Sequence, residues 1–456
     1  MYYSEETIAA VATPAGHGGV GIIRVSGAKA GEAEKIITGK QTSPRFASYT
    51  DFRDSNGNKI DEGLVIYFKE PHSYTGEDVV EFQCHGGPIV LNRLMQEILK
   101  IDKVRLADPG EFTKRAFLNG KIDLTQAEAI QDLINATSIQ AAKSAVNSLS
   151  GSFSGKVYEL LNALIKIRTY VEATIDFPDE SIDFVSEGDV LKELQVLKDK
   201  VQDIRNAAKQ GILLNEGINI VIAGRPNAGK SSLLNELLGV ERAIVTDIAG
   251  TTRDTIRETI NIDGLPVHIT DTAGLRSNTD NAVEKIGINR SWNEIQKASR
   301  ILFLFDISGN DSQEQIALFE EIIKNTENKI PCTILFNKTD KKTDFKIPEE
   351  LQNNTYIKIS VKSKTGLLEL KEHIKHFAGY ANTTEGIFSA RRRHLNAMDK
   401  VLKALNNAEA NLNNNANMEI AAEDLKIAQN SLNEITGKYT ADDLLSNIFN
   451  TFCVGK

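Results

Sequence analysis

Cysteine is scarce in this chain, because only Cys84, Cys332 and Cys453 occur among its 456 residues. Three cysteines so far apart in sequence exclude a disulfide framework and predict a reducing compartment, the cytoplasm. Long apolar runs are also missing, and the N-terminus has no basic region followed by an apolar stretch. We therefore expect neither a membrane span nor a signal peptide.

Positive charge is not in excess either. The chain has 53 Lys and Arg residues against 62 Asp and Glu residues, a net charge of −9. This balance argues against a protein that mainly coats nucleic acid, although a local basic patch stays compatible with RNA as a partner. The 41% hydrophobic and 25% charged residues are typical of a globular protein, and the length predicts two to four domains.

The first 120 residues mix short strand-like runs with Gly-rich turns, as in residues 18–27, 64–68 and 78–87. This pattern predicts an α+β domain over residues 1–120. Residues 121–216 have a helical pattern instead, with little Pro or Gly before a break near residue 178. We expect several long helices there.

One of these helices has a recognisable start. Thr125 and Glu128 have the spacing of a capping box, in which two side chains satisfy free N–H groups of the first helical turn. The spacing predicts that the helix begins near Thr125.

Apolar runs alternate with helix-length segments over residues 217–380, which predicts a parallel sheet with crossover helices. After residue 380 the helical pattern returns and continues over residues 381–456. The simplest architecture inserts the sheet domain into a helical domain whose two halves pack together. The expected strands are residues 218–224, 266–274, 301–308, 332–337 and 356–361.

A phosphate-binding motif follows the first of these strands. Residues 224–231 are Gly-Arg-Pro-Asn-Ala-Gly-Lys-Ser and match G-x-x-x-x-G-K-[ST], with a helix pattern directly after them. The glycines allow backbone N–H groups to surround phosphate oxygens. Lys230 is expected to contact the β- and γ-phosphates, and the Ser231 hydroxyl is expected to bind Mg²⁺.

Two later motifs predict which nucleotide binds. Residues 271–274 fit D-x-x-G, whose Asp holds Mg²⁺ through water and whose Gly N–H senses the γ-phosphate. Residues 337–340, Asn-Lys-Thr-Asp, fit N-K-x-D after another strand. The Asp340 carboxylate can accept hydrogen bonds from N1–H and the amine of guanine, a donor pair that adenine lacks. The fold class is therefore multidomain α/β, with a P-loop GTPase domain inserted into an α-helical domain behind the N-terminal α+β domain.

A glutamine is missing where many small GTPases use one to orient water, because Leu275 follows the D-x-x-G motif. An apolar side chain cannot orient water, so help is expected from Glu284, Arg276, a cation or a partner. Residues 250–254, Gly-Thr-Thr-Arg-Asp, have the place of a switch segment in which a Thr completes the Mg²⁺ shell.

Together these residues resemble the bacterial MnmE (TrmE) family of tRNA-modification GTPases. The resemblance covers essentially the whole chain. The quoted runs are residues 73–87, 109–130, 224–235, 244–254 and 271–276, with the terminal Phe-Cys-Val-Gly-Lys of 452–456. It implies a homodimer formed by a folate-binding N-terminal domain. It also implies a partnership with the FAD-dependent protein MnmG, and a carboxymethylaminomethyl group added to carbon five of the wobble uridine of certain tRNAs.

For the nucleotide site, the resemblance implies potassium in place of an arginine finger, because a cation beside the phosphates offsets developing negative charge. The implied potassium ligands are Asn227, Thr246, Ile248 and Thr251. The implied Mg²⁺ ligands are Ser231 and Thr252, and the implied water-orienting acid is Glu284, although one extra residue before it loosens this match. The full set of expected GTP contacts is Asn227, Ala228, Gly229, Lys230, Ser231, Ser232, Thr246, Thr251, Thr252, Asp271, Thr272, Ala273, Gly274, Asn337, Lys338, Asp340, Ser360, Val361 and Lys362.

For the N-terminal domain, the resemblance implies a site for formyl- or methylene-tetrahydrofolate. Its implied residues are Arg24, Glu81, Lys121 and Lys456; each taken singly is more simply a solvated surface charge. Cys453 is either a small buried hydrophobe or a thiol beside the folate one-carbon unit.

Other side chains have plainer interpretations. We expect Cys84 and Cys332 in the core and His85 in a turn. Residues 391–393, three arginines, form a solvated helix face that could contact tRNA phosphate.

Two alternative functions remain. A GTP-gated RNA-binding or assembly factor would explain the nucleotide motifs but leave residues 73–87, 109–130 and 452–456 unexplained. A P-loop ATPase is disfavoured by Asp340. Formyl-tetrahydrofolate binding distinguishes the first alternative, and nucleotide competition distinguishes the second.

Overall fold

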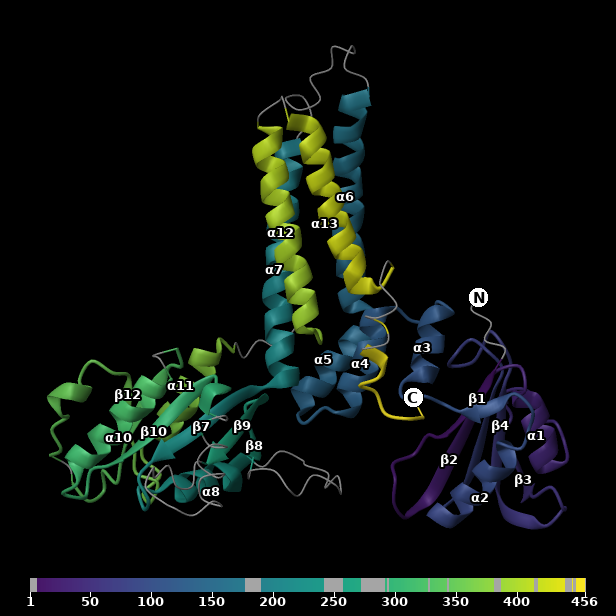
Figure 1. Cartoon of the computed structure of the whole chain (residues 1–456), viewed down its shortest axis with the longest axis horizontal. Helices are drawn as coiled ribbons and strands as arrows, with labels where there is room; N and C mark the ends of the chain where they lie inside the picture. Colours follow the sequence, from purple (N-terminus) through teal and green to yellow (C-terminus); the bar gives the residue numbers. More distant parts are fainter. Residues whose placement is uncertain are drawn as a thin grey trace. The chain divides into compact units, whose positions relative to one another are not determined.

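The computed structural model (Figure 1) divides the chain into two compact units, and each is described by itself. The first unit comprises Met1–Gln131, Leu149–Lys198 and Ala397–Lys456; the second comprises Asp132–Ser148 and Asp199–Asn396. The structure describes residues 6–176, 190–241, 257–271, 292, 295–326, 329–342, 344–380, 387–413, 417–438, 445 and 448–455.

The first unit contains a six-stranded sheet with the order β3-β4-β5-β2-β1-β6. All neighbouring strands are antiparallel except β1 and β6, which are parallel. The expected combination of helices and an antiparallel sheet in the N-terminal residues is confirmed, because α1 and α2 pack against the sheet. The elements are β1 Thr7–Val11, β2 Gly18–Ser26, α1 Ala30–Thr38, β3 Ser48–Arg53, β4 Lys59–Phe68, β5 Val79–Gly86, α2 Pro88–Ile98, β6 Val104–Leu106 and α3 Glu111–Leu118.

Alternation along the strands gives this sheet two different faces. One face carries Val80 and Phe82 of β5 into a core shared with α1 and α2. The opposite face carries Ile8 and Ala10 of β1, which pack against Phe112 of α3. Because side chains alternate, Glu81 must lie on the face opposite Phe82.

Long helices complete the first unit, and α6 (Ser152–Asp176) packs along α13 (Met418–Thr436). Arg168 of α6 donates a 2.8 Å hydrogen bond to Gln429 of α13. Most of α4 (Leu124–Ile134) and of α12 (Arg392–Leu412) also belongs to the first unit. Helix α7 (Val190–Glu216) is divided between the units after Lys198, and α5 (Ile139–Leu149) belongs almost entirely to the second unit.

The predicted capping box of α4 is wrong, because the capping residue lies two positions before Thr125. Helix α4 begins at Leu124, so Thr125 lies inside it. Asp123 is the residue that accepts a 2.9 Å bond from the N–H of Gln126, whose side chain accepts a 3.0 Å bond from the N–H of Asp123. An aspartate and a glutamine therefore form the box that the sequence suggested for a threonine and a glutamate.

The second unit contains a six-stranded sheet with the order β12-β11-β10-β7-β9-β8. Five strands are parallel and only the edge strand β8 is antiparallel to its neighbour. Their apolar runs are buried on both faces, as expected for strands covered by helices on each side. The elements are β7 Ile218–Gly224, α8 Lys230–Glu241, β8 Arg257–Ile262, β9 Leu265–Asp271, β10 Arg300–Asp306, α10 Ser312–Asn325, β11 Cys332–Asn337, the short 3₁₀ helix η1 Glu349–Leu351, β12 Tyr356–Lys358 and α11 Leu367–Ala378.

Candidate functional site

The nucleotide motifs meet at the carboxyl edge of the parallel sheet, where ligands of such sheets bind. Strand β7 leads into residues 224–231, β10 ends at Asp306, and β11 ends at Asn337. Adjacent strands β7, β10 and β11 therefore bring three loops together.

The loop between β7 and α8 is tightly packed against β11. A Cβ at Gly229 would lie only 2.6 Å from Nδ2 of Asn337, so a side chain does not fit. Lys230 is buried at the start of α8, and its Nζ donates to the carbonyls of Gly224 (2.9 Å) and Arg225 (3.1 Å). Its ammonium is thus held inside the loop, while Ser231 and Ser232 of the first helical turn are exposed.

Asn337 joins this loop to the segment after β12. Its Nδ2 donates to the carbonyl of Ala228 at 2.9 Å, and its Oδ1 accepts the N–H of Val361 at 3.3 Å. The side chain is buried. It therefore fixes the phosphate loop relative to residues 360–362.

Asp340 lies at the surface beside the same segment. Its Oδ1 accepts a 2.6 Å hydrogen bond from the buried hydroxyl of Ser360, which also accepts the N–H of Ser363 at 3.2 Å. The hydrogen bond from Ser360 lowers the pKa of Asp340 below its ordinary value. The carboxylate is thus ionised at neutral pH, and Ser360 fixes one of its oxygens.

Lys338 connects the loops from the other side. Its Nζ donates to the carbonyl of Asn227 at 3.1 Å and forms an ion pair with Asp306. Burial alone would raise the pKa of Asp306, but bonds from Lys338 and Ser308 outweigh it and lower this pKa. The sequence prediction missed Asp306; a carboxylate ending a buried strand was the available signal.

A second candidate site lies in the first unit around Arg24. The register of β2 and β5 places Arg24 opposite Glu81, and Arg24 Nε donates to Glu81 Oε1 at 2.8 Å. Both side chains are mostly buried, so the interpretation as solvated surface charges is wrong for these two. The guanidinium also lies 5.3 Å from the ring of Tyr74 and 5.7 Å from that of Phe112. A cation between aromatic faces beside a carboxylate suits a flat polar heterocycle with an anionic tail.

The C-terminal segment reaches this site. Arg24 Nη1 donates to the carbonyl of Gly455 at 3.4 Å, and the N–H of Gly110 donates to the carbonyl of Cys453 at 3.3 Å. Phe452 is buried, whereas Cys453 itself is exposed, so its interpretation as a buried hydrophobe is wrong.

Lys121 belongs to the same neighbourhood through the loop that carries Tyr74. Its Nζ donates to the carbonyl of Pro71 at 2.9 Å, and nearby Asn119 donates to the carbonyl of Thr75 at 2.9 Å. These bonds hold both ends of residues 71–75.

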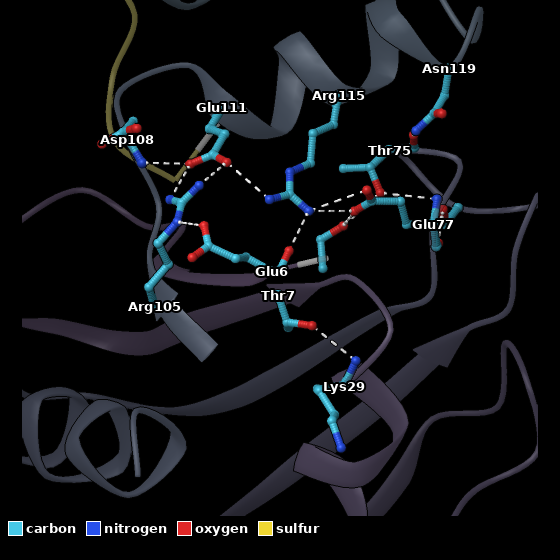
Figure 2. Close-up of polar contacts among 12 residues, drawn as sticks. Glu6, Thr7, Lys29, Thr75, Glu77, Arg105, Asp108, Glu111, Arg115 and Asn119 are labelled. Atoms are coloured by element: carbon cyan, nitrogen blue, oxygen red, sulfur yellow. Dashed lines mark hydrogen bonds and ion pairs between the residues drawn. The ribbon is translucent and has the colours of Figure 1, made fainter. Parts of the chain in front are cut away.

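A charge network centred on the buried Arg115 contacts Glu77, two residues after this loop (Figure 2). Arg115 is almost fully buried and bonds Glu77 at 3.0 Å, Glu111 at 3.0 Å and the carbonyl of Glu6 at 3.1 Å. Arg105 donates two 2.8 Å bonds to the same Glu111. The sequence prediction missed this network, since its members are scattered from residue 6 to residue 115.

Comparisons with known proteins agree with this architecture. A family model described as "MnmE helical domain" matches residues 124–453, and one described as "GTP-binding protein TrmE N-terminus" matches residues 7–121. A curated "tRNA modification GTPase MnmE" from Mannheimia succiniciproducens is 52% identical over 453 residues, 99% of this chain and 100% of that protein. One of the same name from Pasteurella multocida is 52% identical over 452 residues, with the same coverage.

The chain belongs to the MnmE family. The resemblance inferred from the motifs is confirmed, as is the fold class with a P-loop GTPase domain inserted into the helical domain. A solved structure of a variant of Era from Aquifex aeolicus, bound to GDP and tetrafluoroaluminate, is 24% identical. It covers 41% of this chain and 66% of that one, with a TM-score of 0.29.

Several residues named in the sequence predictions lie outside the described part of the chain. They are Thr246, Ile248, Thr251, Thr252, Thr272, Ala273, Gly274, Leu275, Arg276, Glu284 and Lys456, together with the side chain of Asp271. Among the residues that the structure describes, no cluster of three or more His, Cys, Asp or Glu side chains could hold a metal. No helix of this part is long and apolar enough to cross a membrane.

The remaining predictions had mixed outcomes. Cys84 is buried as expected, while Cys332 is only partly buried at the edge of the core. His85 lies within β5, which ends at Gly86, so the prediction of a turn is wrong; its Nδ1 bonds Asp61 at 2.8 Å. Arg391 pairs with Asp132 at 3.0 Å and is not simply solvated, whereas Arg392 is mostly exposed beside Glu216.

Proposed function

We propose that this GTPase of the MnmE family acts in tRNA modification, adding a carboxymethylaminomethyl group to carbon five of the wobble uridine with an MnmG-like FAD protein. The observation that carries the proposal is the whole-length similarity to proteins named tRNA modification GTPase MnmE, at about half identity. The alternative, an RNA assembly factor without modification chemistry, leaves the Arg24 site without a role.

GTP occupies the carboxyl edge of the second sheet in this proposal. Asp340, with Ser360 behind it, accepts hydrogen bonds from guanine, and the N–H groups of residues 360–362 line the other side of the base. The bond between Ser360 and Asp340 supports this role, because it fixes one carboxylate oxygen and leaves the group ionised. Asn337 and Lys338 hold the loop that binds the base next to the loop that binds the phosphates, through bonds to residues 227 and 228.

The phosphates lie along residues 227–232. Lys230 faces the β- and γ-phosphates, with the exposed hydroxyl of Ser231 beside it as an oxygen ligand for Mg²⁺, together with Thr252. Asn227, with a φ of 65°, has its carbonyl held by Lys338 and its exposed side chain available to a monovalent cation.

Potassium supplies positive charge beside the phosphates when bound, through Asn227, Thr246, Ile248 and Thr251. Glu284 orients the water that attacks the γ-phosphate, which compensates for the missing glutamine at Leu275. Amide, carbonyl and hydroxyl oxygens of this kind suit a large cation.

Tetrahydrofolate, carrying a formyl or methylene carbon, binds at the Arg24 site. Arg24, Glu81, Lys121 and Lys456 hold its polar ends, and the pair of aromatic rings beside Arg24 supports a planar pterin. Cys453 contacts the one-carbon unit in this proposal, which its exposure on the segment that reaches the site supports.

The active form is a cytoplasmic homodimer joined through the N-terminal domains. Val20 of β2 and Ile89 in the first turn of α2 are 60% and 80% exposed, and β2 and β5 pair at Gly18 and Gly86 beside them. Exposed apolar side chains at one end of a sheet favour burial against a second copy.

Nucleoside analysis of tRNA tests this function. In a strain lacking the gene, the modified wobble uridine should disappear, and the wild-type gene should restore it. Arg24→Met should fail to restore it, because it removes the charge between Glu81 and the aromatic rings. Purified wild type should also hydrolyse GTP at least about tenfold faster in potassium than in sodium.

The controls separate the parts of the proposal. Arg24→Met should keep the full GTP hydrolysis rate, since Arg24 belongs to the other unit. Unchanged tRNA in the deletion strain would favour the assembly-factor alternative. Equal GTP hydrolysis rates in potassium and sodium would show that potassium has no role in hydrolysis. They would leave the conclusion from the tRNA nucleoside analysis unchanged.

A further inference from the structure

The strands of the β8–β9 hairpin run from the end of the second sheet that carries the nucleotide loops to its opposite end. Strand β8 follows the switch-like residues 250–254, and β9 ends at Asp271, the first residue of the D-x-x-G motif. The turn at Asp263 and Gly264 lies at the other end, roughly 20 Å away for a seven-residue strand. Both γ-phosphate-responsive segments are therefore attached to one end of this hairpin.

The turn is fixed to α11 and the residues after it. Lys375 Nζ bonds Asp263 Oδ2 at 2.6 Å and Glu372 at 2.6 Å, and only 6% of the Lys375 side chain is exposed. The hydroxyl of Tyr380 donates to the carbonyl of Asp263 at 3.0 Å. The hydrogen bond with Asp263 is also the main reason that the pKa of Lys375 is raised.

The same turn contacts the first turn of α5. The Ser138 hydroxyl donates to the carbonyl of Gly264 at 3.2 Å and accepts the N–H of Ala141 at 3.0 Å, so one hydroxyl both caps α5 and binds the hairpin. A Cβ at Gly264 would lie 2.7 Å from Cδ of Gln140, which shows how closely the two elements approach.

Helix α5 is in turn bonded along its length to residues 387–391. Ser389 donates its N–H to the carbonyl of Ser144 at 3.1 Å and accepts a 3.0 Å bond from the Ser148 hydroxyl. Ser389 and Arg391 both bond Asp132, near the end of α4. Because the boundary between the two units falls between Gln131 and Asp132, α4 itself runs from one unit into the other.

We propose that Asp263, Lys375 and Tyr380 are positioning residues that couple the GTP state to α5. A hydrogen-bonded hairpin is stiff along its strands, so a displacement of the segments at its nucleotide end moves the turn. The bonds from Lys375 and Tyr380 to Asp263 keep the turn rigid, so that it moves as one body. Its bond with Ser138 then displaces α5, which is bonded to residues 387–391. Two of these residues bond Asp132. The coupling goes beyond the proposed function and depends on the GTPase cycle, not on folate chemistry.

Amide hydrogen exchange of the full chain in potassium buffer tests this coupling, with GDP compared with GDP plus aluminium fluoride. In the wild type, exchange of α5 amides should differ by about fivefold or more between the two states. Asp263→Asn keeps a favourable Asn-Gly turn and removes only the charge pair, and Lys375→Met removes the same pair from the other side. In both variants the α5 difference should vanish, while residues 224–232 still respond to the nucleotide.

Lys324→Met is the matched control, because it removes an exposed lysine from α10 in the same unit and should leave the α5 response unchanged. Tyr380→Phe removes only the hydroxyl bond and should give an intermediate response. The coupling is wrong if α5 is insensitive to the nucleotide in the wild type, or if both charge variants respond as the wild type does. A strain carrying either variant should also make less modified tRNA per GTP hydrolysed, a ratio that a merely structural residue would not change.

Discussion

At the scale of single residues, Arg115 is the side chain whose loss should matter most to the first unit. It is 2% exposed and shared between Glu77 and Glu111. Removing one partner of a buried ion pair leaves uncompensated charge, so Arg115→Met should lower the free energy of unfolding by about 3–5 kcal/mol. Urea unfolding monitored in the first unit measures this loss.

Arg105→Met is the comparison for that variant. Arg105 contacts the same Glu111 but is 37% exposed, so the loss should be about 1 kcal/mol or less. Equal losses for the two variants would contradict the role given to burial.

The same network predicts a pH dependence. Burial would raise the pKa of Glu111, but bonds from Arg105, Asp108 and Arg115 outweigh it and hold this pKa below 4.5. A lowered folded-state pKa contributes stability above pH 4.5 that disappears as the pH falls through the folded value. Wild-type stability should therefore fall below about pH 4.5 more steeply than that of Arg115→Met.

Residues that belong to short motifs could be predicted from the sequence, and residues recruited from a distance could not. Asn337 and Asp340 were identified because their spacing carries chemistry. Arg115 and Asp306 were not, because their roles depend on partners such as Glu77 and Lys338, which only the folded chain brings close.

At the scale of elements, the C-terminal segment depends on the start of α3. Gly110 has a φ of 67°, and a Cβ there would lie 2.6 Å from the carbonyl of Phe449 and 2.9 Å from Phe452. Gly110→Ala should therefore displace residues 448–455 in addition to straining the backbone. Amide exchange of a peptide covering these residues should become at least about tenfold faster, equivalent to about 1.4 kcal/mol of lost protection.

Gly120→Ala isolates the backbone strain from the steric effect. Gly120 follows the same helix, has the same φ of 67°, and has nothing within 4 Å of an added Cβ. It should cost about 1 kcal/mol of stability while leaving exchange of residues 448–455 unchanged. Equal exchange in the two variants would show that α3 does not hold the segment.

Strands were predicted better than helix ends. The apolar runs 218–224 and 332–337 coincide with β7 and β11, because buried parallel strands have few polar positions. The cap of α4 was misplaced because Asp123, Thr125 and Glu128 offer competing donors and acceptors within two turns, and only backbone geometry decides between them.

At the scale of the whole molecule, ligand binding should distinguish the two units. Because GTP is proposed to bind residues of the second unit, a non-hydrolysable GTP analogue should raise the unfolding temperature of that unit selectively. At one hundred times the dissociation constant the stabilisation is about 2.7 kcal/mol. Calorimetry should show two transitions of which one moves; equal shifts of both would contradict independent units.

The domain limits inferred from sequence, at residues 120, 216 and 380, stay predictions. Residues 132–148 belong to the same unit as the nucleotide sheet, because bonds from α5 to residues 387–391 hold them there. The sequence pattern could not reveal to which unit residues 132–148 belong, because an amphipathic helix has the same periodicity whichever domain it packs against.

The three cysteines have a practical consequence for experiments. Burial raises the pKa of Cys84 to about 11 and that of Cys332 to about 12, so neither forms a thiolate readily at neutral pH. Cys453 is exposed on the segment that reaches Arg24. A thiol-specific dye will therefore attach at one native position, which gives an optical reporter of the C-terminal segment without any engineered label.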